Sequence, residues 1–351
     1  MKNFIITLNG YGQMLKENFR DISLFEYAVK DNFNSITEKG KWGYIRLGKT
    51  FEKAYFSLFA DQSDFPGESF IRSLKYNGFS EKIATLFLGG FLTHVEGKVV
   101  ETRPRLSDKE LYGLLDFVSE GQTKFQFVVN NGESIIGFTK NLPVKHLPFP
   151  CSMKNMKFEI CLPADREFAD INNIINRSSR VLVSHPINNV REDLSEPIAN
   201  LFWLWGMGKR KHILPFYEKI NKKTFYISLD NDLNDLSCLL GFKQVNDISM
   251  CEDGSLLWLN NTLDCKENKA LWVKRFERFD RDSLNHIRRI CAKDECRILF
   301  IFDSFTDKDM VLNSEWGIYC VVTNCSSFPF RLKKHIRKSR IFIEDFFKIN
   351  G

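Results

Sequence analysis

Several polar and charged side chains in this sequence lie where β-rich runs end or where helices begin. Asn9 directly follows the apolar run at residues 4–8, and Asp303 follows another such run. Glu52 lies near the start of residues 50–60, whose apolar side chains recur at helical spacing. Because ligands bind at the carboxyl ends of strands in parallel α/β sheets, these positions predict acid–base chemistry or a cation site.

A second candidate site lies in residues 184–191, which read SHPINNVR and follow a predicted strand at 181–183. If the segment is a loop at the end of that strand, its polar side chains face a ligand. The alternative is a loop whose side chains are locked by hydrogen bonds to the neighbouring backbone. The candidate ligand-binding residues of this region are His185, Asn188, Arg191 and Asn200. The candidate acid–base groups of the whole chain are Glu52, His185 and Asp303.

Residues 184–191 and 197–208 together resemble one protein family. The first matches a His-Pro-x-Asn-x-x-Arg pattern, and the second, PIANLFWLWGMG, matches an Ala-Asn-x-x-Trp-x-Trp-Gly-x-Gly pattern. Both patterns are typical of cofactor-independent phosphoglycerate mutases of the archaeal type, within the alkaline phosphatase superfamily. Further landmarks follow the family's order, at residues 4–12, 24–28, 40–43, 93–97, 239–241 and 276–280. The resemblance implies an alkaline-phosphatase-like fold.

The same resemblance implies a two-metal phosphotransferase site, in which carboxylates and histidines hold divalent ions beside a Ser nucleophile. This sequence departs from the family at the positions that carry the chemistry. Asn9 stands where the family's first strand ends in a ligand Asp, and an amide is a poorer ligand for a divalent ion. Phe51 stands at the nucleophile, with Glu52 at the following Asp, and a phenyl ring cannot attack phosphorus.

The later metal ligands are also replaced. The family's Asp-His-x-Thr-Pro motif aligns with residues that keep Asp303 and have Ser304 in place of the His, and Asn313 stands at a further ligand His. Asp264 and Asp303 are the remaining candidate metal ligands. We expect no metal cofactor, or at most one weakly bound divalent cation such as Mg²⁺, because two carboxylates without histidines suit Mg²⁺ better than Zn²⁺.

The phosphate-binding positions have changed as well. The family's Gly-Arg-Gly turn corresponds to residues 67–69, in which Glu68 puts a carboxylate where a guanidinium would bind phosphate. Leu88 stands at another arginine position. Arg103 and Arg105 stand at the family's later arginine pair, so they join Asn9 among the candidate ligand-binding residues.

The elements that would position these residues alternate between helix and strand. We predict helices at 24–38, 50–60, 166–177, from 197, 233–240 and 270–290, and strands at 4–8, 181–183, 224–228, 256–259, 297–302 and 317–322. Between 85 and 165 we predict short strands at 86–92, 98–101, 125–129, 135–138 and 158–161, with one helix at 108–118. The fold class is therefore α/β, a doubly wound, mostly parallel sheet. Its core domain comprises residues 1–84 and 166–351, and an α+β lid domain is inserted at 85–165.

Composition excludes several classes of protein. The 50 Lys+Arg and 44 Asp+Glu give a net charge of +6, and no DNA-binding motif is present, so we expect no nucleic acid partner. No run approaches about eighteen apolar residues, so we expect a cytoplasmic protein with no membrane association. The nine cysteines are scattered without a C-x-x-C pair, which predicts reduced core thiols.

Two hypotheses about function follow. The first is a phosphoglycerate-mutase-like protein that has lost metal-dependent phosphoryl transfer and serves as a binding, scaffold or regulatory protein. The alternative is an enzyme with rebuilt chemistry, a phosphomutase, phosphatase or other transferase, acting on a small phosphorylated or carboxylated metabolite. The expected partner is such a phosphorylated metabolite or a partner protein. Enzyme status, pathway and oligomeric state stay open at this stage.

Overall fold

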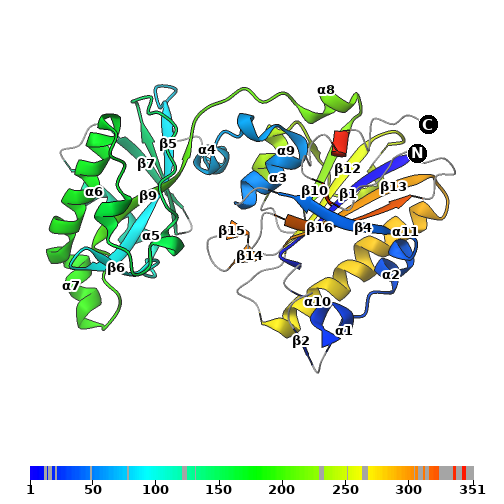
Figure 1. Ribbon diagram of the computed structural model, residues 1–351, viewed down its shortest axis with the longest axis horizontal. Coiled ribbons are helices and arrows are strands. Elements are labelled where there is room, and N and C mark those ends of the chain that lie inside the picture. The colour runs from blue at the N-terminus through cyan, green and yellow to red at the C-terminus, as the bar shows by residue number, and fades with distance from the viewer. Residues whose placement is uncertain are drawn as a thin grey trace. The chain divides into compact units, whose positions relative to one another are not determined.

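A computed structural model describes most of the chain, which divides into two compact units (Figure 1). The described residues are 1–11, 14, 18–19, 22–47, 50–76, 79–120, 125–130, 132–228, 233–250, 252–262, 268–303, 305–306, 311–312, 316–323, 335–336 and 342–344. Unit 1 comprises Met1–Phe65 and His212–Gly351, and unit 2 comprises Pro66–Lys211. The inserted unit is therefore wider at both ends than the lid domain predicted at 85–165.

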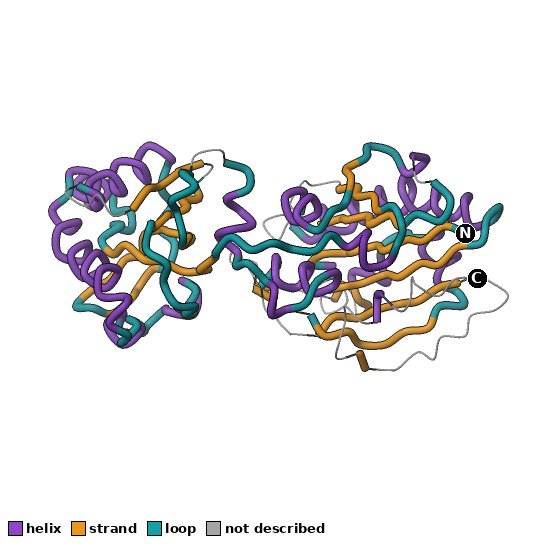
Figure 2. The backbone as a smooth tube through the Cα atoms, turned by 90° about the horizontal axis from the view of Figure 1, so that it is seen from above, coloured by secondary structure: helices purple, strands orange, loops and turns teal. Residues whose placement is uncertain are grey.

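Within the described residues, unit 1 contains an eight-stranded sheet in the order β11-β10-β12-β1-β13-β16-β4-β17 (Figure 2). The strands from β11 to β13 are parallel to their neighbours, whereas β16 is antiparallel to both β13 and β4. The predicted doubly wound, mostly parallel sheet is confirmed. Its strands are β1 (Lys2–Asn9), β4 (Lys41–Arg46), β10 (Thr224–Ser228), β11 (Lys243–Gln244), β12 (Leu256–Thr262), β13 (Cys296–Phe302), β16 (Trp316–Thr323) and β17 (His335–Ile336). Short strand pairs are β2 (Asn18–Phe19) with β3 (Ile22–Ser23), and β14 (Phe305–Thr306) with β15 (Val311–Leu312).

Helices cover both faces of this sheet, which explains why its central strands are apolar without alternation. On one face, Phe4, Ile6 and Leu8 pack into a core that includes Phe276 of α10. On the other face, Trp258 of β12 contacts the rings of Tyr55 and Phe59 of α3. Figure 1 shows α10 and α11 along one side of the strands. The helices of unit 1 are α1 (Leu24–Tyr27), α2 (Asp31–Thr37), α3 (Phe51–Phe59), α8 (Phe216–Ile220), α9 (Asn234–Leu239), α10 (Lys269–Phe279) and α11 (Asn285–Cys291).

Two helix predictions in unit 1 need correction. The segment predicted as one helix at 24–38 forms α1 and α2, because the backbone of Ala28 is extended between them. The long helix predicted at 270–290 runs from α10 to α11 through a π-helical turn at Asp280–Leu284. That turn places the Asp280 carboxylate against the start of α2, where it accepts hydrogen bonds from the backbone N–H groups of Asn32 at 3.1 Å and Phe33 at 2.6 Å. Asp280 thus supplies acceptors for otherwise unpaired N–H groups.

Unit 2 is built on an antiparallel sheet in which β5 pairs with β6, β8 and β9. The helices α5 and α6 pack on it through Leu114, Leu115, Ile171 and Ile175. Because β9 pairs with β5 along most of its length, the chain after residue 165 belongs to this unit. The strands of unit 2 are β5 (Thr85–Val95), β6 (Lys98–Glu101), β7 (Phe125–Asn130), β8 (Glu133–Phe138) and β9 (Leu201–Gly208). The helices are α4 (Glu68–Ser73), α5 (Asp108–Ser119), α6 (Ala169–Val181) and α7 (Pro186–Asp193).

Three element predictions in unit 2 are wrong. Residues 181–183 are the end of α6 and a 3₁₀ turn, with Val183 51% exposed, so this valine does not contribute to a buried strand. The helix predicted from 197 is a loop followed by β9, whose aromatic residues favour a strand. The strand predicted at 158–161 is a 3₁₀ turn in which Phe158 is buried and Ile160 is 72% exposed.

The two ends of unit 2 are joined by a hydrogen bond. The backbone N–H of Lys209 donates to the carbonyl of Pro66 at 2.7 Å, at the positions where the chain enters and leaves this unit. Among the residues that the structure describes, no helix is long and apolar enough to cross a membrane.

Candidate functional site

The carboxyl ends of β1, β12 and β13 bring together polar residues that are far apart in the sequence. In the parallel register, Asn9 pairs with Thr262 of β12, and Leu8 pairs with Phe302, the residue before Asp303. Asn9 and Asp303 are 0% and 3% exposed. The sheet therefore places the predicted candidates Asn9 and Asp303 on the same edge, at the ends of neighbouring strands.

A network of amides and hydroxyls fills this edge on the β12 side. The Asn9 amide N–H₂ donates to Asn260 Oδ1 at 2.6 Å and to Thr262 Oγ1 at 3.1 Å. The Thr7 hydroxyl donates to the same Asn260 oxygen at 2.7 Å and accepts from the Trp258 indole N–H at 2.9 Å. All five side chains are buried, and none of them carries a charge. These buried polar groups therefore satisfy one another's hydrogen bonds inside the protein.

Sequence reasoning missed the partners of Asn9. The strand predicted at 256–259 stops before Asn260 and Thr262, and neither was among the candidate residues. A usable signal was present, because the polar run of residues 260–262 follows an apolar strand as Asn9 does. Buried amides at the end of a parallel strand predict a polar cluster at that edge.

Asp303 is in a different electrostatic situation from its amide neighbour. Its Oδ1 accepts a hydrogen bond from the Gly10 N–H at 2.5 Å. Burial raises the pKa of the Asp303 carboxyl well above its ordinary value, and the hydrogen bond from Gly10 opposes this effect without overcoming it. The buried carboxyl is therefore held toward its neutral form.

The residues at this edge fit a metal ion poorly. Asn9 Oδ1 and Asp303 Oδ2 are buried oxygens with no hydrogen-bond partner among the described residues, and they are the donors left to a cation here. Mg²⁺ usually keeps several waters and binds through one or two carboxylates, whereas one of these oxygens belongs to an amide and the other to a carboxyl held toward its neutral form. Within the described ranges, no three His, Cys, Asp or Glu side chains gather to hold a metal ion. Asp264, Ser304 and Asn313, three further positions of the predicted metal site, lie outside the described residues.

The nucleophile position of the resemblance lies at the start of α3. Thr50 is the N-cap of this helix, Phe51 is its first residue and Glu52 follows it. Glu52 is 7% exposed, so this candidate acid–base group belongs to the interior of unit 1. His185, the third predicted acid–base group, belongs to unit 2.

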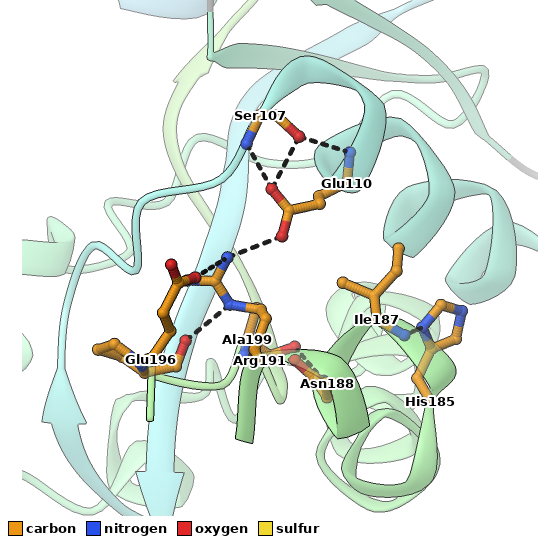
Figure 3. Close-up of polar contacts among 9 residues, drawn as sticks. Ser107, Glu110, His185, Ile187, Asn188, Arg191, Glu196 and Ala199 are labelled. Atoms are coloured by element: carbon orange, nitrogen blue, oxygen red, sulfur yellow. Dashed lines mark hydrogen bonds and ion pairs between the residues drawn. The ribbon is translucent and has the colours of Figure 1, made fainter. Parts of the chain in front are cut away.

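In unit 2, the segment predicted as a ligand-facing loop is the start of α7 (Figure 3). His185 is the N-cap residue, and its Nδ1 accepts from the Ile187 N–H at 3.2 Å. The Asn188 amide N–H₂ donates to the carbonyls of Leu182 at 2.7 Å and Ala199 at 3.1 Å, while its Oδ1 accepts from the Ala199 N–H at 2.8 Å. Both side chains bond to nearby backbone, as the alternative reading of this segment expected.

Arg191 links α7 to α5 and to the following loop (Figure 3). It is 3% exposed, and its guanidinium contacts Glu110 Oε1 at 2.8 Å, Glu196 Oε2 at 3.2 Å and the Pro197 carbonyl at 2.9 Å. Burial raises the pKa of Glu110, but hydrogen bonds from Ser107 and Arg191 outweigh it, so the net pKa is lowered. The arginine is thus held by two carboxylates of the protein itself.

The side chain of Asn200 also bonds to nearby backbone, in this case that of β5. Its Oδ1 accepts from the His94 N–H at 2.8 Å and its N–H₂ donates to the His94 carbonyl at 3.0 Å, so the side chain pairs with the strand as another backbone would. Trp203 is fully buried and donates from its indole N–H to the Pro148 carbonyl at 3.0 Å, so this tryptophan of the family-like pattern is a core aromatic.

The remaining candidate positions lie elsewhere in unit 2. Glu68 is buried in the first turn of α4. Arg103 and Arg105 are exposed after β6. Burial and the neighbouring charge of Arg72 lower the pKa of the Arg103 guanidinium. Arg72 itself pairs with Glu133 at 2.7 Å, and the ligand-binding role of Arg103 stays a prediction.

Two solved structures share this fold over essentially the whole chain. The first is a Pyrococcus horikoshii protein, with a TM-score of 0.62 and 17% identity, covering 100% of this chain and 98% of that one. The second is the cofactor-independent phosphoglycerate mutase of Thermoplasma acidophilum, with a TM-score of 0.55 and 17% identity, covering 100% of both chains. At this identity the likeness shows the fold alone. The chain therefore has the alkaline-phosphatase-like fold of these neighbours.

Sequence comparison gives relatives named for one activity. No family model matches the chain. It is 24% identical over 233 residues to the 2,3-bisphosphoglycerate-independent phosphoglycerate mutase of Pyrococcus horikoshii, covering 60% of this chain and 56% of that protein. Similar mutases of Methanothermobacter thermautotrophicus (31% over 86 residues) and Methanosarcina barkeri (30% over 124) match 24% and 35% of this chain and 21% and 30% of their own lengths. The chain is thus homologous to archaeal cofactor-independent phosphoglycerate mutases, and the matches span about half their length or less.

Proposed function

We propose that this protein is a phosphoglycerate-mutase-like protein that has lost metal-dependent phosphoryl transfer and serves as a binding, scaffold or regulatory protein. The observation that carries the proposal is the neutral network at the carboxyl ends of β1 and β12. There the Asn9 amide directs both of its donated hydrogen bonds to Asn260 and Thr262. The network therefore offers a bound phosphoryl group little charge.

Phosphoryl transfer depends on positive charge that neutralises the phosphoryl oxygens and on an activated nucleophile. At this edge the described groups include amides, hydroxyls and Asp303, whose pKa is raised by burial, while the Arg275 guanidinium donates to the Thr262 carbonyl at 3.0 Å. The residue that opens α3 is Phe51, which has no nucleophilic atom. Removal of an activated nucleophile alone lowers rates by several orders of magnitude, which supports a role without turnover.

A binding role requires a cavity, and unit 1 has one at the opposite edge of its sheet. It measures about 590 Å³ and is lined by Tyr217, Asn221, Lys222, Lys223, Thr224, Phe225, Gly241, Lys243 and Glu252. Thr224 begins β10, so the cavity lies at the amino ends of the parallel strands. Burial and the buried Arg297 lower the pKa of Lys222. An anion would relieve both effects, so we assign a phosphorylated or carboxylated metabolite to this cavity.

The proposal is tested first by activity and metal content. Purified protein, assayed for interconversion of 3-phosphoglycerate and 2-phosphoglycerate with added Mg²⁺ or Mn²⁺, is expected to show no turnover above background. Elemental analysis is expected to find metal well below one ion per chain, with a melting temperature that EDTA does not change. Turnover that Asp303→Ala abolishes, or one tightly held metal ion per chain, would reject the proposal.

Asn9→Asp provides the matched variant. It buries a second carboxyl at the edge that holds Asp303 and removes the amide donor to Asn260 and Thr262, so it is expected to lower the melting temperature in EDTA, and Mn²⁺ is expected to restore part of the loss. The wild-type protein is expected to melt at the same temperature with or without Mn²⁺. A wild-type response as large as that of the variant would mean that the native edge already binds the ion.

The lysine cavity has its own test. A thermal-shift series with 3-phosphoglycerate, inorganic phosphate and sulfate is expected to show stabilisation of about 1.4 kcal/mol at roughly ten times the dissociation constant of the best ligand. Lys222→Gln is expected to remove the shift, whereas Lys39→Gln, which changes an exposed lysine away from the cavity, keeps it. Equal shifts in the two variants would exclude this cavity as the ligand site.

One observation favours the second candidate function, an enzyme with rebuilt chemistry. Asp303 is a buried carboxyl with a raised pKa at the end of a parallel strand, which is a property of general acids. Under this alternative the protein would turn over a small phosphorylated or carboxylated metabolite, and Asp303→Asn would abolish that turnover without unfolding the protein. A partner protein is also within the proposal, and co-purification from the native host tests it.

A further inference from the structure

Two cysteines that the sequence separates by four residues meet in the structure. Cys291 is the last residue of α11 and Cys296 is the first residue of β13. The turn between them is closed by hydrogen bonds from the N–H groups of Lys293 and Asp294 to the Ile290 carbonyl, each at 2.9 Å. The Cys296 side chain thereby lies within hydrogen-bonding reach of the Cys291 thiol.

The two thiols differ in access to solvent. Cys296 is 2% exposed, and its Sγ also lies 3.5 Å from the Asp294 carbonyl. Cys291 is partly exposed. A small oxidant can therefore reach Cys291, while Cys296 lies protected next to it. This arrangement matches that of a reactive thiol with a resolving thiol.

The electrostatics of the pair favour reaction at Cys291. The hydrogen bond from Cys296 lowers the pKa of the Cys291 thiol, and burial and Asp294 oppose this effect without cancelling it. By contrast, burial raises the pKa of the Cys151 and Cys161 thiols, and that of Cys320 to about 12. Because the thiolate is the nucleophile, Cys291 is the more reactive thiol in this comparison.

We propose that Cys291 and Cys296 are a peroxide-sensitive modification site that closes to an intramolecular disulfide. The Cys291 thiolate attacks one oxygen of hydrogen peroxide and the O–O bond breaks, which yields a sulfenic acid at Cys291 and, after protonation, one water. The Cys296 sulfur then attacks the Cys291 sulfur, the S–S bond forms and the S–O bond breaks. The hydroxyl leaves with the Cys296 proton as a second water. Two thiols are oxidised by two electrons and one peroxide is reduced to two waters.

The surrounding structure allows the final step. The S–S bond is about 2.05 Å long, so the hydrogen-bonded sulfur atoms must approach each other. The turn residues 292–295 are exposed, and the Glu295 carbonyl accepts a hydrogen bond from the Lys2 N–H at 2.8 Å, so the approach must come mainly from the α11 side of the turn. Cys296 lies opposite Lys2 in the β1–β13 pairing, so the disulfide would tie α11 to the strand next to β1. This inference does not depend on the proposed function.

The full-length protein provides a direct test. Trypsin cuts after Arg289, Lys293 and Arg297, so the two cysteines fall in separate peptides, residues 290–293 and 294–297. After mild peroxide treatment and blocking of free thiols, mass spectrometry is expected to find these peptides linked, with the loss of two hydrogen atoms, and dithiothreitol is expected to separate them. Cys291 is expected to be oxidised faster than Cys151, because the pKa of the Cys291 thiol is lowered and that of the Cys151 thiol is raised by burial.

Variants assign the two roles. Cys291→Ser is expected to abolish the linked peptides, and Cys296→Ser to leave a sulfenic acid on Cys291 that dimedone traps. Cys151→Ser, the control, is expected to keep the link. If Cys296→Ser does not fold, Cys296→Ala and peptide mapping of the wild-type protein give the same information. Unlinked peptides at a peroxide dose that oxidises Cys151, or a cross-link of Cys296 to another cysteine, would overturn the proposal.

Discussion

At the scale of single residues, the buried amide of Asn9 and the buried carboxyl of Asp303 lie on the same edge of the sheet but differ in how many hydrogen bonds they make. Asn9 is neutral and finds two acceptors in β12. Asp303 receives one hydrogen bond, and burial raises its pKa well above the ordinary value. In the unfolded chain this carboxyl ionises at about pH 3.9, so folding must hold a proton that solvent would remove. Asp303 is therefore a destabilising residue at neutral pH.

Asp303→Asn is expected to raise the free energy of unfolding by about 1–3 kcal/mol at neutral pH, the scale of an imperfectly satisfied buried polar group. Because the folded pKa is raised, the folded state binds more protons above about pH 3.9, and the stability of the wild-type protein falls as pH rises from there toward the folded pKa. The advantage of the variant should therefore grow from about pH 4 to about pH 7.5, as measured by urea unfolding.

Asp253→Asn is the control for this comparison, because Asp253 is an exposed carboxylate of the same unit. Its effect is expected to stay within about 0.5 kcal/mol at every pH. Equal pH dependence in wild type and Asp303→Asn would mean that the pKa of Asp303 is not raised in the folded protein.

The sequence predicted those residues of this site that depend on local patterns, and it missed the contacts between residues far apart along the chain. Asn9 could be chosen because it ends the first apolar run. The polar run that contains Asn260 was visible, but its pairing with Asn9 was not, because the two residues are 251 positions apart and the parallel pairing of β1 with β12 joins them. The pKa of Asp303 depends on burial by segments from across the chain, so it too required the structure.

At the scale of elements, residues 184–191 build the start of a helix. His185 caps α7, Asn188 joins it to the loop before β9, and Arg191 connects it to α5. The family-like pattern therefore has a structural explanation within unit 2, because each polar group bonds inside the protein. Sequence reasoning placed the segment after a strand because valine favours strands, whereas the helical spacing of Ile171, Ile174 and Ser178 continues α6 to Val181.

The helix cap gives a pH-dependent prediction. Burial lowers the pKa of His185, so the unfolded chain takes up a proton first as pH falls below about 6.5, and the stability contributed by neutral His185 is lost on the acid side. His185→Asn keeps an acceptor at the N-cap and cannot titrate. It is expected to unfold with less pH dependence between about pH 7.5 and about pH 5, measured by denaturant titration.

His185→Ala is the companion variant, because it removes both the acceptor and the titration. It is expected to lose about 1 kcal/mol at neutral pH, the usual cost of an N-cap. If His185→Asn keeps the full acid-side loss of the wild type, the titrating group lies elsewhere.

Gly67 allows close contact between α4 and β9. Its φ is +95°, and a Cβ there would lie 2.0 Å from the Met207 carbonyl oxygen and 2.4 Å from Gly208 Cα. Gly67→Ala is therefore expected to destabilise the protein by more than about 2 kcal/mol, measured by thermal and urea unfolding.

Gly132→Ala is the matched control, because Gly132 also has positive φ, at +75°, but nothing lies within 4 Å of a Cβ there. It is expected to cost only about 1 kcal/mol, from backbone strain alone. Equal losses in the two variants would mean that the contact with β9 contributes nothing.

At the scale of the whole molecule, each unit has its own hydrophobic core. The core of unit 2 brings together side chains of β5, α5, α6 and β9. The sequence pattern indicated an insertion with short strands, and it missed the width of that insertion because the pairing of β9 with β5 is long-range. Alternation of helices and strands was enough to predict the sheet of unit 1, but the antiparallel β16 was not distinguishable from a parallel strand by its composition.

A fragment of residues 66–211 is expected to fold on its own, because its core residues and its terminal hydrogen bond all lie within it. The fragment should melt cooperatively in circular dichroism and show dispersed amide signals in NMR spectra. An Arg191→Met form of the fragment is expected to melt at a lower temperature, because it leaves Glu110 and Glu196 without their buried partner. A fragment without a cooperative transition would show that unit 2 needs unit 1 to fold.

The hydrogen bond between Pro66 and Lys209 has a consequence for how such a gene can change. Because the two ends of the inserted segment meet at 2.7 Å, a single excision or exchange of coding sequence at this seam would replace the whole segment. The flanking reading frame would then need only a short loop to close. Recombination could thus supply a different insert to the same parental scaffold, with selection acting on the two parts separately.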